Sequence, residues 1–255
     1  TFDPGSDFQD LGPGDSRDTT ITYTITDEDG ETDTAVLTIT VTGLSDPPVA
    51  VDDSNTTDED STVSGNVLPN DSDPEGSPLV VTPIINETGS SGGTFTVNDD
   101  GSYTFDPGSD FQDLGPGDSR DTTISYAITD EDGETDTAVL TITVTGLSDP
   151  PVAVDDSNTT DEDSTVSGTV LPNDSDPEGG VLSVTPISGQ AGSNGGIFTV
   201  GSDGAYTFDP GSDFQDLGPG DSRDTTITYT ITDAVGETDT AVLTVTVTGL
   251  SDPPV

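Results

Sequence analysis

The chain has 255 residues, of which 51 are Asp or Glu and only three are Lys or Arg, giving a formal net charge of -48. So acidic a surface excludes nucleic acid and anionic membranes as electrostatic partners and favours cations, with divalent ions first. The absence of Cys and Lys also excludes disulfides and Lys–Asn isopeptide crosslinks.

The apolar content is low as well. Hydrophobic residues make up 27% of the chain, which at this charge lies near the compositional border of disorder. The fold therefore needs something that neutralises its negative charge, and bound metal is the remaining option. The acidity would also suit a protein from a halophile. The sequence has no run of about 18 apolar residues that would span a membrane and no recognisable signal peptide. Because Thr1 falls inside a repeat, we interpret the sequence as a piece of something longer.

An internal repeat of 103 residues organises the chain. The segment TFDPGSDFQDLGPGDSRDTT begins at Thr1, Thr104 and Thr207, and segments 47–149 and 150–252 differ at 18 positions. This length is that of one immunoglobulin-like sandwich. We predict two complete repeats at 47–149 and 150–252, the C-terminal half of a repeat at 1–46, and the start of the next linker at 253–255. The half repeat should be incomplete unless another chain supplies the rest.

The repeats meet at a proline-containing linker. It runs from Gly43 to Asp53, returns at 146–156, and begins again at Gly249. Pro47 and Pro48 lack amide hydrogens, fix their own φ, and bias the preceding residue toward extended geometry. The linker is therefore predicted to be a stiff, extended crossing that cannot continue a sheet, with a carboxylate on each side.

Strand patterns fill the rest of each repeat. Alternating or β-branched runs between Gly, Pro, Asn and Asp clusters predict about seven short antiparallel strands and no helix. In the first complete repeat the predicted strands are 49–52, 62–68, 79–85, 93–97, 102–105, 122–129 and 135–145. The last two show the clearest period-two pattern, and the Asp-Gly between them predicts a hairpin. In a two-sheet sandwich the loops gather at two ends, and both ends are acidic.

One acidic loop has the spacing of a calcium ligand set. Asn70-Asp71-Ser72-Asp73-Pro74-Glu75-Gly76, repeated at 173–179, places carboxylates at alternate positions before a closing Gly. Ca²⁺ takes about six to eight oxygens from a sharply turned loop. A complete EF-hand is absent, but the linker and neighbouring loops supply further oxygens. We predict calcium binding here; the alternative is a solvated acidic turn.

The hairpin at 130–134 is a second candidate ligand cluster, and a plain tight turn is its alternative. Its copy at 233–237 has Ala and Val in place of two carboxylates while keeping the same length. Either that copy binds more weakly, or the hairpin carboxylates are not essential.

Other polar features have structural interpretations. Arg17, Arg120 and Arg223 occupy one position in a long acidic loop and are predicted to fix it by pairing with Asp, with Phe111 and Leu114 as apolar anchors; substrate binding is the alternative. Rows of Thr on the last two strands are interpreted as a polar solvent face, with carbohydrate or ice binding as the alternative. Without His, Cys, Lys or Trp, only carboxylate pairs remain for catalysis, so we predict that the protein is not an enzyme.

Three stretches resemble a known group of proteins. GSYTFDP from Gly101, TISYAITDEDG from Thr123 and TAVLTITVTG from Thr137 are similar to the VCBS and cadherin-like tandem repeats of giant bacterial surface proteins, including RTX adhesins. The resemblance implies an all-β fold of tandem Ig-like or cadherin-like Greek-key sandwiches, arranged head to tail outside the cell after one-step secretion. VLPNDSDPEG from Val67 is similar to the segment that sends aspartates to an interdomain calcium site in such repeats.

The loops, the linkers and the resemblance together give the predicted calcium ligands. They are Asp46, Glu59, Asp71, Asp73, Glu75, Asp130, Asp132, Asp149, Glu162, Asp174, Asp176, Glu178 and Asp233. The function predicted from them is a calcium-rigidified extender of a secreted bacterial adhesin or surface filament, serving adhesion or biofilm formation. Its partners would be neighbouring repeats and possible further copies, without nucleic acid or membrane insertion. The alternatives are a self-assembling extracellular matrix filament with strand exchange between chains, and a carbohydrate- or ice-binding module.

Overall fold

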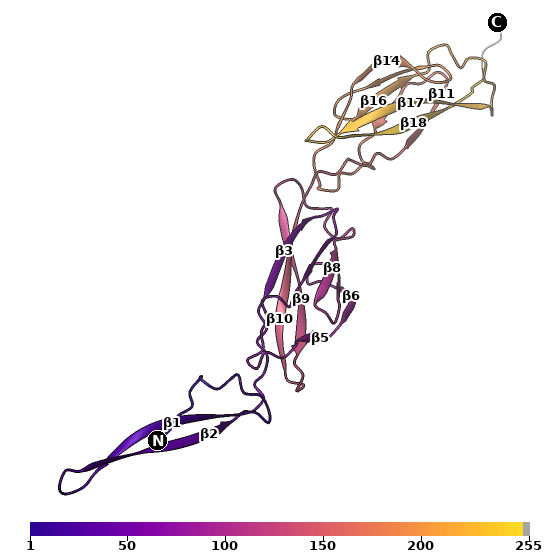
Figure 1. Cartoon of the computed structure of the whole chain (residues 1–255). Helices are drawn as coiled ribbons and strands as arrows, with labels where there is room; N and C mark the ends of the chain where they lie inside the picture. Colours follow the sequence, from indigo (N-terminus) through magenta and orange to yellow (C-terminus); the bar gives the residue numbers. More distant parts are fainter. Residues whose placement is uncertain (252–255) are drawn as a thin grey trace. The chain divides into compact units, whose positions relative to one another are not determined.

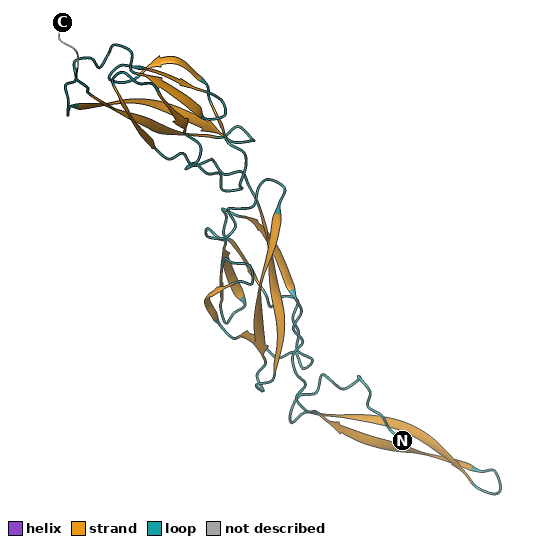
Figure 2. Ribbon diagram, turned by 180° about the vertical axis from the view of Figure 1, so that it is seen from behind, coloured by secondary structure: helices purple, strands orange, loops and turns teal. Residues whose placement is uncertain are grey.

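A computed structural model describes residues 1–251, so the predicted linker at 253–255 and the last residue of the predicted repeat 150–252 lie outside the described residues. Over residues 1–251 the chain forms strands, turns and loops (Figure 2), and this part contains no helix long and apolar enough to cross a membrane. The chain divides into two compact units. One comprises residues 1–111 and 119–145, and the other comprises residues 112–118 and the chain from Gly146 onward.

The first complete repeat folds as two facing four-stranded sheets (Figure 1). The first sheet has the order β3 (Asp53–Asp58), β10 (Thr135–Thr145), β9 (Ser119–Thr129), β5 (Val80–Val81). The second has the order β4 (Val63–Asn66), β8 (Ser102–Asp106), β7 (Thr94–Val97), β6 (Ile84–Thr88). Strands β3 and β10 pair in parallel, whereas the other neighbours pair antiparallel.

The second complete repeat has the same topology. Its first sheet is β11 (Asp156–Asp161), β18 (Thr238–Thr248), β17 (Ser222–Thr232), β13 (Ser183–Val184). Its second sheet is β12 (Val166–Thr169), β16 (Ala205–Asp209), β15 (Ile197–Val200), β14 (Ile187–Ala191). The predicted all-β sandwich fold is therefore confirmed for both complete repeats.

The core follows from strand alternation. In β10 the side chains of Leu140, Ile142 and Val144 are fully buried, while the Thr residues between them face outward, as the period of two requires. From the other sheet, Phe95 and Phe105 fill the interior with their ring centroids 4.6 Å apart. A few large side chains thus supply a complete core to a chain of low apolar content.

Two predicted strands are wrong. Val49 makes only an isolated bridge to Ser72; the first strand is β3, a polar segment that the hydrophobic pattern did not reveal because it lies on a sheet edge. The predicted strand 79–85 divides into β5 and β6, which belong to different sheets. Pro83 stands between them and cannot donate to a ladder, so the chain changes sheets there.

Residues 1–46 contain only the hairpin of β1 (Ser16–Thr26) and β2 (Thr32–Thr42). This hairpin repeats the sequence of β9 and β10, but no second sheet covers it (Figure 1). Ile25 is therefore 61% exposed, whereas its counterpart Ile128 is fully buried. The apolar face of β1 and β2, formed by Ile21, Tyr23, Ile25 and Leu37, lacks the partner that the same residues have in the complete repeats.

We predict that a copy of residues 47–103 fused ahead of Thr1 will complete this half repeat. The fusion restores the strands that cover the same hairpin elsewhere, and each buried Ile or Leu then contributes about 1.5–3 kcal/mol. Amide hydrogen exchange in β1 and β2 should slow to the level of β9 and β10. Exchange as fast as in the unfused chain would show that the hairpin cannot accept these strands.

Candidate metal site

The acidic loop after β4 meets the linker that precedes its own repeat. The backbone N–H of Asp46 donates to Glu75 Oε1 at 3.1 Å, and Asp73 Oδ1 accepts the N–H of Ser77 at 2.8 Å. Burial raises the pKa of Glu75, and the negative charges of Asp73 and Asp46 raise it further. Three of the predicted ligands are therefore close enough to repel one another at the linker.

The hairpin between β9 and β10 reaches the same linker. The Ser45 hydroxyl donates to Asp132 Oδ2 at 3.2 Å. Asp130 is 8% exposed, and its Oδ1 accepts the N–H groups of Asp132 and Glu134, both at 2.9 Å. The structure thus brings the hairpin and the acidic loop to the same linker, as the sequence predicted.

Several carboxylate oxygens in this region are buried without a hydrogen-bond partner: Asp73 Oδ2, Asp130 Oδ2 and Glu134 Oε2. An unsatisfied buried acceptor costs roughly 1–3 kcal/mol, and more when it is charged. A cation would remove this cost. All of these atoms are hard oxygens, which is the donor chemistry that Ca²⁺ prefers.

The second complete repeat has the same arrangement at its own linker. The N–H of Asp149 donates to Glu178 Oε1 at 2.6 Å, and burial together with the Asp176 carboxyl raises the pKa of Glu178. Asp176, Glu178 and Asp233 line one small pocket beside Ser148 of the linker. Ala234 and Val235 also line this pocket. They stand where the first complete repeat has Glu131 and Asp132, so the pocket is more apolar than it would be with those two carboxylates.

Asp71 and its copy Asp174 accept hydrogen bonds from the end of the linker rather than from Asp46 or Asp149. Asp71 Oδ1 accepts the N–H of Val51 at 2.8 Å, and its Oδ2 lies 3.5 Å from the Tyr126 hydroxyl. In the second complete repeat, Asp174 Oδ1 accepts the N–H of Val154 at 2.8 Å and lies 3.5 Å from the Tyr229 hydroxyl. These two side chains therefore contact both the end of the linker and the buried tyrosine of their own repeat.

The Tyr126 hydroxyl is the centre of a cluster that the sequence analysis missed. It lies 2.8 Å from Asp53 Oδ2 and 3.0 Å from the Val51 carbonyl, yet a hydroxyl donates only one hydrogen bond. Burial is the main cause that raises the pKa values of Asp53 and Asp71, and their mutual repulsion adds to it for Asp71. The available signal was the position of Tyr126 among inward-facing residues, because a buried hydroxyl needs a partner.

Two predicted glutamates lie at the other end of each repeat. Glu59 and Glu162 are fully buried. Glu162 Oε1 accepts the N–H of Leu250 at 2.6 Å, and its Oε2 has no hydrogen-bond partner. Since Leu250 lies in the linker that follows, this glutamate stands beside the next linker rather than the preceding one.

The described carboxylates do not converge as a ready-made metal cluster. Across residues 1–251, no group of three or more Asp or Glu side chains is arranged to hold a metal ion. The residues at each linker fit a divalent cation by donor chemistry, burial and unsatisfied charge. Which of the predicted ligands bind calcium therefore stays a prediction.

The arginine loop is a structural element. Arg17 pairs with Asp10, and Arg223 with Asp216 at 2.6 Å. Each guanidinium also lies over a Phe ring, 5.8 Å from the centroid for Arg17 and 5.6 Å for Arg223. Cation–π contact and ion pairing together hold the long loop against the repeat.

Comparison with known proteins gives one family and one curated relative. A family model described as bacterial cadherin-like domain matches residues 45–146 and 148–249. The calcium-binding lectin RapA2 of Rhizobium johnstonii is 32% identical over 232 residues, covering 81% of this chain and 98% of that protein.

Among solved structures, mouse protocadherin-24 (domains EC1–3) matches with a TM-score of 0.45 and 17% identity over 91% of this chain and 79% of that one. Human mucin-like protocadherin (EC1–2) matches with a TM-score of 0.45 and 16% identity over 79% of this chain and 98% of that one.

The Tyr126 cluster predicts a pH-dependent mutational effect. A carboxyl whose pKa is raised by folding favours the folded state below its unfolded pKa, and this contribution is lost as the pH rises through the folded pKa. The variant Asp53→Asn/Asp156→Asn lacks this titration in both repeats. In chelator, its melting temperature relative to the parent should therefore be more favourable at pH 7 than at pH 4, as measured by calorimetry.

The matched control is Asp136→Asn/Asp239→Asn. Hydrogen bonds from the N–H groups of Ala50 and Ala153 lower the pKa values of these carboxyls, so the trend should have the opposite sign. If both double variants follow the same pH dependence, the cluster does not titrate as described.

Proposed function

Because the chain belongs to the bacterial cadherin-like domain family, we propose that its repeats form a calcium-stiffened extender of a secreted bacterial adhesin or surface filament. In this role the repeats supply length and stiffness between a cell and the surface that it contacts. Near-identical units suit such a spacer, since each contacts only its neighbours in the chain. Cadherin-like domains and lectins are typically binding or structural proteins, in keeping with the prediction that the protein is not an enzyme.

The observation that carries the proposal is the set of buried carboxylate oxygens without hydrogen-bond partners near the linkers: Asp73 Oδ2, Asp130 Oδ2, Glu134 Oε2 and Glu162 Oε2. In the first complete repeat Asp46, Asp73, Glu75, Asp130 and Asp132 would hold the ion. In the second repeat the corresponding ligands are Asp149, Asp176, Glu178 and Asp233, while Glu162 would serve the linker that follows. Bound calcium supplies the positive charge that these groups lack, and so ties the linker to the loops.

The curated relative supports the same proposal, since its name describes a calcium-binding lectin. We place the protein outside the cell, where free calcium is abundant enough to fill sites of modest affinity. Its partners in this proposal are the neighbouring repeats of the same chain. With a net charge of -48, contact with nucleic acid or membranes is not part of the proposed role.

A second candidate is a self-assembling filament, and the exposed apolar face of β1 and β2 favours it. In that case two copies would bury these faces against each other or exchange strands. Sedimentation velocity distinguishes the candidates: a chain that stays monomeric at high concentration in calcium rules out assembly through this face.

Calcium should stiffen and stabilise the chain. Small-angle scattering in calcium should give a longer, better-defined particle than in EDTA, and calorimetry should give a higher melting temperature. Because the ion neutralises the linker carboxylates, the variant Asp73→Asn/Glu75→Gln should lose at least tenfold in calcium affinity at that linker, measured by titration calorimetry.

The control variant is Glu87→Gln/Asp99→Asn, which removes two exposed charges of the same repeat that are not among the predicted ligands. It should bind calcium like the parent chain. Equal losses of calcium affinity in both variants would show that the effect arises from net charge alone. An unchanged scattering profile with no metal retained in mass analysis would contradict the proposal itself.

A further inference from the structure

The outer face of the second sheet in the first complete repeat carries an ordered array of polar side chains. Strand register aligns Ser64, Thr104 and Thr96 across β4, β8 and β7. A neighbouring row aligns Asp106, Thr94 and Thr88 across β8, β7 and β6. Within a row, residues on adjacent strands lie about 4.8 Å apart, and the two rows lie about 6.7 Å apart along the strands.

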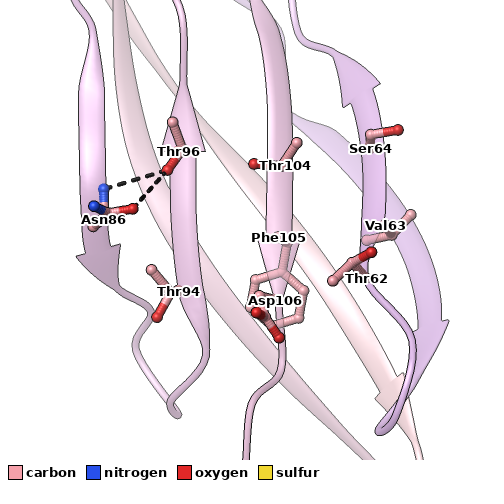
Figure 3. A pocket seen from close by; sticks show the side chains of 9 residues that line it. All are labelled: Thr62, Val63, Ser64, Asn86, Thr94, Thr96, Thr104, Phe105 and Asp106. Carbon is pink, nitrogen blue, oxygen red and sulfur yellow. Dashed lines mark hydrogen bonds between the residues drawn. The ribbon is translucent and has the colours of Figure 1, made fainter.

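All of these side chains except Thr88 line a groove (Figure 3). Its lining comprises Thr62, Val63, Ser64, Asn86, Thr94, Thr96, Thr104, Phe105 and Asp106. Phe105 is fully buried and lies beneath the hydroxyl groups. The groove is therefore lined mainly by uncharged donors and acceptors. Asp106 is the one carboxylate of its lining, although the chain as a whole is rich in Asp and Glu.

Asn86 is positioned at one side of the groove by an unusual backbone. It is the one non-glycine residue with positive φ, +52°, among residues 1–251, and it lies where the β6–β7 register shifts between Ile84 and Glu87. Its N–H donates to Thr96 Oγ1 at 3.3 Å, and that hydroxyl donates to Asn86 Oδ1 at 3.2 Å. Glycine would adopt this conformation with less strain, so the carboxamide is held in the groove against a backbone preference.

The second complete repeat places glycine at that position. Gly189 has a φ of +64° and corresponds to Asn86 in the 103-residue repeat. Two hydroxyl groups of the array are lost as well, because Thr88 corresponds to Ala191 and Thr94 to Ile197. The two repeats therefore share one scaffold but differ in the polar groups of this groove.

We propose that the groove of the first complete repeat binds a neutral saccharide chain, a function beyond the calcium-dependent role above. Hydroxyl and carboxamide groups can donate and accept, as sugar hydroxyls do, and Asp106 can accept from two of them. The net charge of -48 disfavours polysaccharides rich in uronic acids. The lining includes no exposed aromatic ring, so a single site is weak, roughly millimolar, because only a few hydrogen bonds offset the cost of association.

The test uses the whole chain in calcium on an array of neutral and uronic-acid-containing oligosaccharides, followed by NMR titration of the neutral oligosaccharides that bind. The variant Asn86→Gly/Thr88→Ala/Thr94→Ile installs residues that the second repeat already carries, so it should fold normally. It should lose at least tenfold in affinity. The converse variant Gly189→Asn/Ala191→Thr/Ile197→Thr should gain a second site.

The matched control is Ile85→Ser/Glu87→Gln, which changes the two other differing residues of β6 outside the groove lining and should bind like the parent chain. Three results would overturn the proposal: no neutral glycan binds, only uronic-acid glycans bind, or affinity is unchanged in the triple variant of the first repeat. Repeating the titration in EDTA separates this proposal from the previous one, because the groove needs no metal and its binding should persist.

Discussion

The structure depends on backbone amides that hold carboxylates in place. The chain has 51 acidic residues and three cationic ones, so ion pairs can neutralise only a few. Instead Glu75 accepts the N–H of Asp46, Asp71 that of Val51, and Asp136 that of Ala50. These hydrogen bonds connect the linker to its repeat without a bound ion. They also place like charges near one another, which is the condition under which a divalent cation has most to contribute.

The same constraint explains why the acidic loop divides in two. Without a bound cation, neighbouring carboxylates repel one another and cannot all point to one place. Each therefore turns toward the nearest hydrogen-bond donor. Glu75 accepts the N–H of Asp46 near the start of the linker, and Asp73 accepts that of Ser77 in its own loop. Asp71 instead accepts the N–H of Val51 near the end of the linker and lies beside the Tyr126 hydroxyl. Alternate spacing in the sequence correctly indicated an arc of oxygens, but it could not indicate which of them the backbone amides of the repeat would hold elsewhere.

Much of the fold could be predicted from the sequence because the 103-residue repeat and the alternation in β9 and β10 are strong local signals. Strand β3 could not, since its polar sequence gains its place only by parallel pairing with β10, and such a long-range contact leaves no periodic pattern. Pro83 lies inside the predicted strand 79–85, and because proline cannot donate to a sheet ladder it marks the change of sheets between β5 and β6. At the site, the meeting of the hairpin with the linker followed from sandwich topology, whereas the Tyr126 cluster depended on side-chain packing that spacing does not encode.

The parallel pair of β3 and β10 has a mechanical consequence. The chain enters each complete repeat close to the start of β3 and leaves it at the end of β10, and the two strands are joined along six residue pairs. A force that pulls on the two ends of a repeat therefore slides these strands past each other, loading their evenly spaced hydrogen bonds together rather than one at a time. Resistance to force in such a domain is set by the barrier to unfolding rather than by equilibrium stability. Each complete repeat thus resists tension between its two ends by shear of one parallel strand pair.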